Sequence, residues 1–261
     1  MPTEPWVTEL FSLRGRVALV TGGSKGLGLS IATGLAEAGA VTVLASRNLE
    51  DCDRSAAELE RRTGVPSFGA RLDVTDEADV AKVFRQVMKK HGRLDVLVNS
   101  AGVNVRALIE ECSLETFEQV VGVNLIGTWL CCREAGRLMK ASGASGSVIN
   151  LGSALSSIGI PMRSPYCSSK AGVIGLTQTV ALEWAETGLR CNALCPGPFR
   201  TGMNLPVLED PERTASLLGR IPVNRWAELV DIRGPAVFLA SDASRYMTGA
   251  ALYIDGGWTA Q

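Results

Sequence analysis

Residues 17–28 are VALVTGGSKGLG, and this stretch decides the fold of the chain. The apolar run 17–20 predicts a strand that is buried on both faces, and the glycines after it allow a sharp turn into a helix. Such a turn also lets the backbone approach a pyrophosphate, which the free N–H groups at the start of the helix can bind. The glycines are spaced G-x-x-x-G-x-G instead of G-x-G-x-x-G. The cluster alone is therefore compatible with a nucleotide site and with a purely structural turn.

Apolar runs and helical patterns alternate along the rest of the chain. Short apolar runs at 41–45, 94–98, 147–151 and 190–195 predict further buried strands. Helical patterns occupy about 26–38, 49–62, 76–91, 114–140 and 166–186. Because this alternation requires parallel strands joined by crossover helices, it predicts an α/β fold, a doubly wound and mostly parallel sheet with helices on both faces. No linker rich in Pro and Gly and no block of charge divides residues 1–261, so we expect a single domain.

The composition excludes several functional classes. The 261 residues include 26 basic and 27 acidic side chains, so the overall charge attracts neither nucleic acid nor anionic lipid. The N-terminus lacks the pattern of a secretory signal, and no apolar run reaches the roughly 18 residues that a membrane span needs. Seven scattered cysteines without a CxxC pair, and the single histidine His91, argue against a zinc site and for free thiols. We expect a cytoplasmic protein with no nucleic-acid partner and no membrane partner.

An irregular segment follows the 190–195 run. Pro196-Gly197-Pro198 interrupts the chain there, and three further prolines occur before residue 226. A loop of this length inside a compact domain usually has a function. We therefore predict a substrate loop or lid at about 197–226.

The end of the second predicted strand bears on the choice of cofactor. A site for NAD places an acidic residue there, which binds the 2′-hydroxyl of the ribose. This chain instead has ASRN at 45–48. Ser46 and Arg47, with Lys25 in the glycine loop, can contact a 2′-phosphate, although Arg47 can also be a solvated surface residue. The missing acid favours NADP(H) over NAD(H).

The ends of the next two predicted strands supply further candidates. Asp73 follows the third strand and can hydrogen-bond an adenine amino group. The small residues of NSAG at 99–102 leave room for a ligand that lies over the edge of the sheet.

Four polar residues are candidates for chemistry. Tyr166 and Lys170 are four apart at the start of a predicted helix, so they share one face, one turn apart. Ser153 lies just beyond the 147–151 run. Asn124 lies in an apolar stretch, where a buried amide needs a hydrogen-bond partner. It can be a structural amide that bonds neighbouring backbone, a site residue, or both.

The motifs TGGSKGLG at 21–28, NSAG at 99–102, YCSSK at 166–170, PGPFRT at 196–201 and YIDGG at 253–257, with Asn124 and Ser153, occur in this order. Together they resemble the short-chain dehydrogenase/reductase family, from about Arg14 to Trp258. ASRN at 45–48 and the segment 238–260 are most similar to members related to gluconate 5-dehydrogenase and 3-oxoacyl-carrier-protein reductase. Ser100 departs from the family, which often has Asn there. The resemblance implies a Rossmann-type fold with seven strands.

By position, the resemblance implies that Asn124, Ser153, Tyr166 and Lys170 form the catalytic set. Hydride transfer to a ketone develops charge on the oxygen, and Tyr166 would deliver the proton while Ser153 hydrogen-bonds the oxygen and Asn124 places a relay water. A free phenol, with a pKa of about 10, is a poor catalyst at neutral pH, and the Lys170 ammonium would lower that pKa. Lys170 would also hold the ribose hydroxyls. The expected cofactor contacts are Gly22, Ser24, Lys25, Gly26, Leu27, Gly28, Ser46, Arg47, Asn48, Asp73, Val74, Asn99, Ala101, Gly102, Tyr166, Lys170, Pro196, Gly197 and Thr201.

The sequence predicts an NADP(H)-dependent oxidoreductase that interconverts a ketone or keto acid and the secondary alcohol. Expected substrate contacts are Ser153, Ala154, Met162, Tyr166, Phe199 and Met203, which suit a small or medium carbonyl compound. One alternative is a catalytically silent nucleotide-binding protein, which would typically lack Tyr166 or Lys170. Another is an NAD-dependent sugar or polyol dehydrogenase. A serine hydrolase is disfavoured because LGSAL at 151–155 lacks a nucleophile-elbow motif.

The resemblance also implies assembly into a homotetramer with D2 symmetry. Apolar side chains on more than one face of the predicted helices 114–140 and 166–186 agree with this, namely Trp129, Leu130, Leu176, Val180 and Trp184. The C-terminal Gln261 resembles a residue that helps to bind structural magnesium in some tetrameric members. An amide oxygen and waters suit that ion.

Overall fold

Seven parallel strands form one sheet, in the order β3-β2-β1-β4-β5-β6-β7. The computed structural model describes residues 5–143 and 145–260. The strands in these ranges are β1 Val17–Thr21, β2 Val41–Ser46, β3 Ser67–Arg71, β4 Val96–Asn99, β5 Gly146–Leu151, β6 Leu189–Pro196 and β7 Ala251–Ile254. The strand order reverses between β1 and β4, and this confirms the predicted doubly wound, Rossmann-type single domain.

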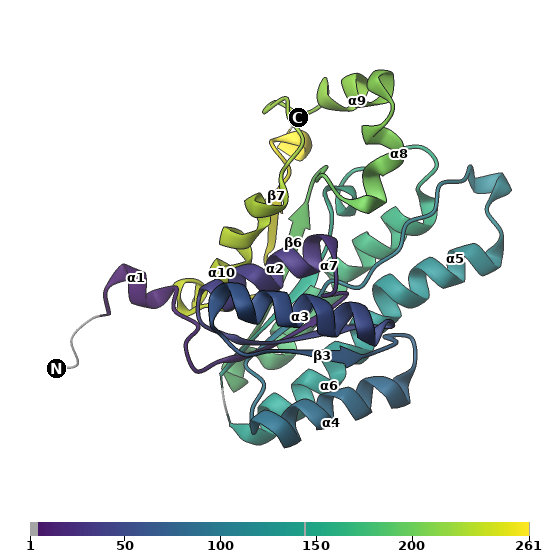
Figure 1. Cartoon of the computed structure of the whole chain (residues 1–261). Coiled ribbons are helices and arrows are strands. Elements are labelled where there is room, and N and C mark those ends of the chain that lie inside the picture. Colours follow the sequence, from purple (N-terminus) through teal and green to yellow (C-terminus); the bar gives the residue numbers. More distant parts are fainter. Residues whose placement is uncertain (1–4, 144, 261) are drawn as a thin grey trace.

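Helices cover both faces of the sheet, as Figure 1 shows. One face is covered by α4 Glu77–His91, α6 Gly127–Ser142 and α7 Ser164–Trp184, and the other by α2 Gly26–Glu37, α3 Leu49–Thr63 and α10 Arg233–Ala240. The remaining helices are α1 Val7–Leu10, α5 Leu114–Val121, α8 Leu205–Leu208 and α9 Pro211–Leu218. In Figure 1, α8 and α9 lie beyond the upper end of the sheet and α1 lies apart at the left.

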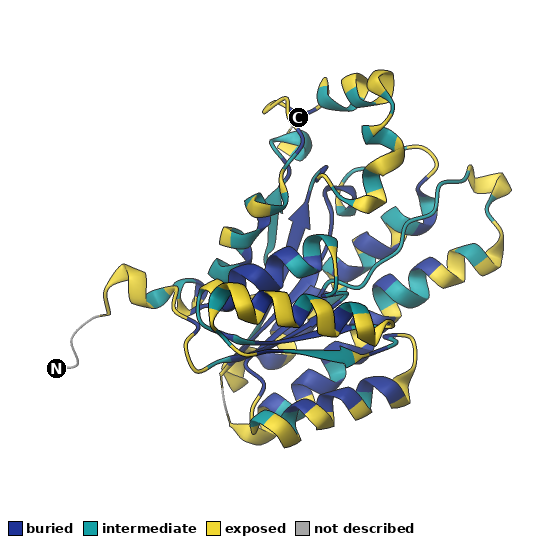
Figure 2. Ribbon diagram, in the orientation of Figure 1, coloured by how far each residue is buried: buried dark blue, intermediate teal, exposed yellow. Residues whose placement is uncertain are grey.

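Each face of the sheet has its own hydrophobic core. Figure 2 shows the central strands buried between helices whose outer sides are exposed, whereas the edge strands β3 and β7 are only partly buried. Phe84 of α4 and Met139 of α6 belong to one core, and Ile31 of α2 and Leu239 of α10 belong to the other. β1 and β4 are buried along their whole length, which explains why their sequences are apolar without alternation.

Local signals set the helix ends. The Asn48 side chain accepts a hydrogen bond from the backbone N–H of Asp51 at the start of α3, and Asp76 accepts from Ala78 and Asp79 at the start of α4. Both helices end at a glycine with positive φ, +69° at Gly64 and +72° at Gly92. The predicted ranges 49–62 and 76–91 therefore agree with the structure to within a residue.

Two predicted segments need correction. The helix expected at 114–140 is interrupted by a π-helical turn at Gly122–Ile126, which separates α5 from α6. The segment 198–226, expected to be irregular, contains α8, α9 and a 3₁₀ turn at Gly202–Asn204. Hydrogen bonds from Arg200 N to Ala227 O (2.9 Å) and from Ala227 N to Pro198 O (3.0 Å) close the base of this loop.

The seven cysteines are free thiols, and five of them are buried. Cys112 and Cys167 are partly exposed. Among the described residues, no helix combines the length and the apolar character that a membrane crossing requires.

Candidate active site

The glycine loop after β1 meets the loop after β4. Gly22 has a φ of +64°, and a Cβ atom there would lie 2.9 Å from the Cα atom of Ala101. The hydroxyl of Thr21 accepts hydrogen bonds from the backbone N–H groups of Ser100 and Ala101, each at 3.2 Å. A Cβ at Gly28 would overlap the carbonyl oxygen of Gly22. The predicted close packing of the glycines is thus present where the strand order reverses.

The glycine loop after β1 and the end of β2 each present an exposed cation, Lys25 and Arg47 respectively. Lys25 and Arg47 are exposed, and no hydrogen bond or ion pair joins either side chain to another residue within 5–143 or 145–260. Ser46 is the last residue of β2, and its hydroxyl donates to the carbonyl oxygen of Asn48 at 3.1 Å. The side chain of Asn48 is engaged as the cap of α3. Two unpaired cations beside a glycine loop are a charge arrangement that fits a phosphate group.

Asp73 lies close to these cations and is held as a carboxylate. Hydrogen bonds from Thr75 (Oγ1 at 2.7 Å and the backbone N at 3.0 Å) lower the pKa of Asp73, and the charges of Arg47 and Arg71 lower it further. An ionised carboxylate is an acceptor for an amino group, as the sequence predicted. Val74 is buried and lies against Gly127, where a Cβ would come within 2.7 Å of Val74 Cγ2.

The predicted catalytic residues converge at the carboxyl ends of β4 and β5. Lys170 follows Tyr166 by one turn of α7, and its Nζ atom lies 5.8 Å from the centre of the tyrosine ring. The same Nζ donates to the carbonyl oxygen of Leu151 at 2.5 Å. A Cβ at Gly102 would lie 3.4 Å from Asn124 Oδ1 and 3.9 Å from Lys170 Nζ. Residues from three segments far apart in the sequence therefore surround one position.

Ser153 is positioned by its own local turn. It precedes the 3₁₀ turn Ala154–Ser156, and its hydroxyl accepts a hydrogen bond from the backbone N–H of Leu155 at 3.1 Å. The hydroxyl is also hydrogen-bonded to Tyr166. The predicted Ser–Tyr–Lys group is assembled.

Asn124 is a structural amide in this structure. It is fully buried in the π-helical turn, a feature that is frequent at functional sites. Its Oδ1 accepts from Val103 N at 2.8 Å, and its Nδ2 donates to Val103 O and to Ser169 Oγ, both at 3.0 Å. The π-helical turn and Ser169 were not predicted, and the spacing of the sequence carries no signal for either.

Burial controls the charges of the two central groups. The protein atoms around the phenol raise the pKa of Tyr166, which is partly exposed, and burial lowers the pKa of Lys170 to about 8. The hydrogen bond from Ser153 and the charge of Arg163 act against the rise at Tyr166. The expected lowering of the Tyr166 pKa by the Lys170 ammonium is therefore corrected: in the protein alone that pKa is raised, and the groups that favour the phenolate are Ser153 and Arg163.

The predicted substrate contacts differ in how far they are exposed. Met162 and Met203 are 44% and 45% exposed, whereas Ala154 and Phe199 are 0% and 1% exposed. Phe199 packs in the core on the α2 and α10 side of the sheet, which argues against the predicted substrate contact. Ala154 likewise has no exposed surface.

Four predicted cofactor contacts also differ in accessibility. Asn99 points into the core, where its Nδ2 donates to Asn150 Oδ1 at 2.9 Å, so its side chain is not available to a ligand. Gly197, next to the buried Pro196, packs closely on β7, since a Cβ there would come within 2.6 Å of Asp255 Cα. Thr201 is partly exposed at the start of the lid segment.

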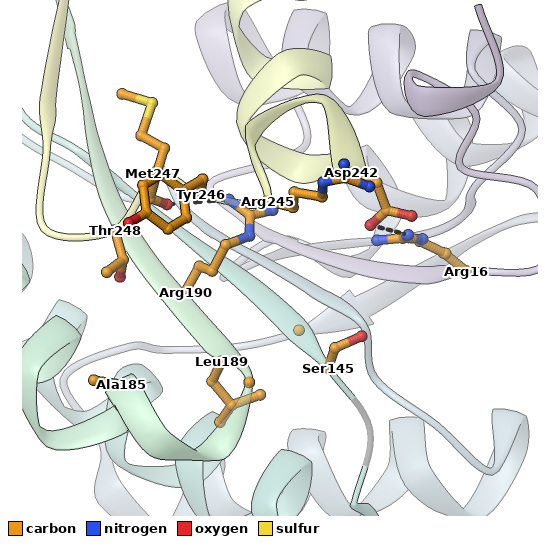
Figure 3. A pocket seen from close by; sticks show the side chains of 12 residues that line it. Arg16, Ser145, Ala185, Leu189, Arg190, Asp242, Arg245, Tyr246, Met247 and Thr248 are labelled. Carbon is orange, nitrogen blue, oxygen red and sulfur yellow. Dashed lines mark hydrogen bonds and ion pairs between the residues drawn. The ribbon is translucent and has the colours of Figure 1, made fainter. Parts of the chain in front are cut away.

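A cavity of about 510 Å³ lies at the opposite edge of the sheet, by the amino ends of β5 and β6 (Figure 3). Two of its three arginines are structural: Arg16 pairs with Asp242 at 2.7 Å, and Arg190 donates to the carbonyl oxygens of Leu239 and Ser241. None of the predicted catalytic residues lines this cavity. No group of acidic, Cys or His side chains that could hold a metal occurs in the described part of the chain, and the predicted magnesium contact Gln261 lies outside it.

The family model described as enoyl-(acyl carrier protein) reductase matches residues 22–259. The chain belongs to the short-chain dehydrogenase/reductase family. Its named relatives are dehydrogenases of this family that act on CH–OH groups, and the recognition from motifs is confirmed.

Named relatives cover nearly the whole chain. The protein is 41% identical to 2-dehydro-3-deoxy-D-gluconate 5-dehydrogenase of Pseudoalteromonas atlantica over 96% of this chain and 98% of the relative. It is 37% identical to gluconate 5-dehydrogenase of Gluconobacter oxydans over 96% of this chain and 97% of the relative. A crystal structure of gluconate 5-dehydrogenase from Burkholderia cenocepacia with NADP and tartrate superposes with a TM-score of 0.94, at 35% identity, and covers 98% of this chain and 100% of that chain. This short-chain dehydrogenase/reductase is thus similar, over nearly its full length, to proteins named as gluconate 5-dehydrogenases or 2-dehydro-3-deoxy-D-gluconate 5-dehydrogenases.

Proposed function

We propose that this protein is an NADP(H)-dependent oxidoreductase that interconverts a ketone or keto acid and the corresponding secondary alcohol. One observation carries the proposal: Tyr166, hydrogen-bonded to Ser153, lies one turn before Lys170 at the sheet edge where the glycine loop meets the end of β4. A catalytically silent protein has no need to keep this arrangement. The names of the relatives support an alcohol or carbonyl substrate.

Each residue of this group has a distinct task. A nicotinamide nucleotide, when bound, supplies or accepts the hydride. In the direction of reduction, Tyr166 gives its proton to the carbonyl oxygen, while Ser153 donates a hydrogen bond to the same oxygen. Lys170 binds the ribose hydroxyls and connects Tyr166 to the proton relay that returns a proton to the phenol. Asn124, in the π-helical turn, places the water of that relay.

The residues that hold the cofactor are those at the ends of β1 to β4. The glycine loop binds the pyrophosphate, because Gly22, Gly26 and Gly28 leave its backbone uncovered by Cβ atoms. Asp73 accepts from the adenine amino group. Thr201 and the backbone after Pro196 hold the nicotinamide carboxamide, and we assign the segment 197–226 as the lid that covers the substrate.

Replacing Tyr166 tests the proposed function. The wild-type protein is expected to oxidise NADPH in the presence of members of a panel of keto compounds, and Tyr166→Phe is expected to reduce turnover by orders of magnitude while NADPH affinity stays nearly unchanged. Tyr246→Phe is the matched control, since that tyrosine is fully exposed. Turnover by Tyr166→Phe close to that of wild type would contradict the assignment of the acid.

The preference for NADP(H) is tested at Arg47. Arg47→Ala removes charge-assisted hydrogen bonds worth about 1.5–3 kcal/mol, so NADPH binding should weaken roughly ten- to a hundredfold while NADH binding changes little. Ser46→Asp should shift preference toward NADH, because a carboxylate there repels a 2′-phosphate. Arg54→Ala, an exposed arginine of α3 paired with Asp51, is the control. Equal weakening of both cofactors by Arg47→Ala would show that Arg47 does not bind the phosphate.

A further inference from the structure

Arg163 is a buried arginine without an acidic partner. It directly precedes α7, three residues before Tyr166, and is only 9% exposed. Its Nη1 donates to the carbonyl oxygen of Met162 at 3.1 Å. No ion pair joins its guanidinium to any acid within residues 5–143 and 145–260. A buried guanidinium in this state lacks the anion that normally compensates for the loss of water.

A second arginine lies beside it. The loop after β4 is joined to the segment before α7 by a hydrogen bond from Ala107 N to Met162 O at 3.3 Å, and Arg106 immediately precedes Ala107. Arg106 is partly exposed and has no ion pair among the described residues. The two positive charges repel each other, and this repulsion together with burial lowers the pKa of Arg163 to about 10. The side chains of Cys167 and Tyr166 raise the pKa of Arg163, but by less.

The backbone at this place is held in an uncommon conformation. Met162 has a φ of +62°, which is rare for a residue with a side chain and costs free energy. The same Met162 carbonyl oxygen accepts from both Ala107 and Arg163, so the strained residue links the two arginine-bearing segments. This link fixes Arg163 against the turn of α7 that carries Tyr166.

We propose that Arg163, with Arg106 beside it, binds the carboxylate of the substrate, so that the enzyme acts on hydroxy acids and keto acids in preference to neutral alcohols and ketones. The planar guanidinium matches a carboxylate with two parallel hydrogen bonds. The anion is the substrate's own and not the cofactor's 2′-phosphate, because the cations suited to that phosphate are Lys25 in the glycine loop and Arg47 after β2, while Arg163 lies beside Tyr166. The inference rests on the proposed function and specifies its substrate class.

The test compares two compounds that differ in one group. D-gluconate carries a carboxylate where D-glucitol carries CH₂OH. Wild-type enzyme should oxidise gluconate with a kcat/KM at least tenfold higher. Arg163→Gln should lower the ratio of kcat/KM for gluconate to kcat/KM for glucitol roughly ten- to a hundredfold, since the charge-assisted contacts are lost for gluconate alone. Any change in the pKa of Tyr166 that follows the loss of the Arg163 charge acts on both substrates and cancels in this ratio. Arg163→Lys should recover part of the loss, and Arg245→Gln, an exposed arginine at the opposite edge of the sheet, should change neither substrate.

A second measurement separates this inference from the proposed function. Gluconate, but not glucitol, should raise the Tm of the wild-type protein, and Arg163→Gln should abolish the rise. That result supports the carboxylate site even if the protein oxidises neither compound. Equal kcat/KM for the two compounds in wild type, or an unchanged ratio of the two kcat/KM values in Arg163→Gln, would overturn the inference while Tyr166-dependent turnover upheld the proposed function. A Tm unaffected by gluconate would overturn it as well.

Discussion

Burial keeps the Tyr166 phenol protonated at neutral pH in the protein alone, because the protonated form is neutral and its pKa is raised. Carbonyl reduction needs the phenol as an acid, so its kcat/KM should stay constant through neutral pH and fall as Lys170, with a pKa of about 8, and then the phenol lose their protons. Alcohol oxidation needs the phenolate, so its kcat/KM should rise with pH through the same range. Measuring kcat/KM in both directions between about pH 6 and pH 10 checks this. An oxidation rate that is independent of pH would contradict it.

Ser153→Ala moves this profile in a direction that can be predicted. The hydrogen bond from Ser153 lowers the pKa of Tyr166, so its loss should shift the rising limb of the oxidation profile to higher pH, in addition to lowering the rate. Ser157→Ala is the control, since that exposed hydroxyl donates only to the carbonyl oxygen of Ala154. A lower rate with an unmoved limb would mean that Ser153 contacts the substrate without tuning the phenol.

Residue types and spacings predict which side chains meet, but not the hydrogen bonds they make. Tyr166, Lys170 and Ser153 could be predicted because helix periodicity and a strand end place them together. The partners of Asn124 could not, because Val103 and Ser169 reach it only after two loops and a helix have packed. Phe199 follows the Pro196-Gly197-Pro198 interruption, so the sequence predicted a loop residue that contacts the substrate. The hydrogen bonds that close the base of the loop instead direct Phe199 into the core.

At the scale of elements, the crossing of α6 and α7 depends on one glycine. A Cβ atom at Gly136 would lie 2.7 Å from Cζ2 of the buried Trp184 ring, so Gly136→Ala should force the two helices apart and destabilise the protein by about 1–3 kcal/mol. Gly234→Ala is the control in α10, where nothing lies within 4 Å and alanine should be neutral or stabilising. Urea unfolding of both variants measures the difference, and equal stability of the two would contradict the tight crossing.

The sequence predicts elements best where they are long or central. The central strands are continuous apolar runs, and α3 and α4 have capping residues as well as periodicity. The edge strand β3, SFGAR, is only partly buried and has no such run. The π-helical turn differs from an α-helix by one inserted residue per turn, which leaves the apolar pattern of 114–140 almost unchanged.

For the whole molecule, the order of strands and helices determines the fold, but it does not determine which apolar residues serve the chain's own core. Leu130, Val180 and Trp184, cited from the sequence as support for assembly, are 5%, 7% and 5% exposed and belong to the core. They are therefore no evidence for a partner. Periodicity alone could not separate these residues from surface residues. How much of a helix surface is buried depends on how the neighbouring helices pack against it, and the sequence pattern does not show this.

Assembly is nevertheless supported by Trp129, one of the residues cited from the sequence, and by exposed apolar residues near it in the chain and on α7 and α5. Ile126, Trp129 and Leu182 are 50%, 45% and 80% exposed, and α5, which carries the exposed Leu114 and Phe117, packs on α7. We propose that copies of the chain cover this surface in a homotetramer. Light scattering at micromolar concentration should then give four times the chain mass of 27.6 kDa. Trp129→Glu should lower that mass, because burying an unpaired carboxylate opposes association, whereas Tyr246→Glu, fully exposed at the opposite edge of the sheet, should leave it unchanged. The mass of a single chain for wild type would exclude the tetramer, and these apolar side chains would then simply be solvent-exposed.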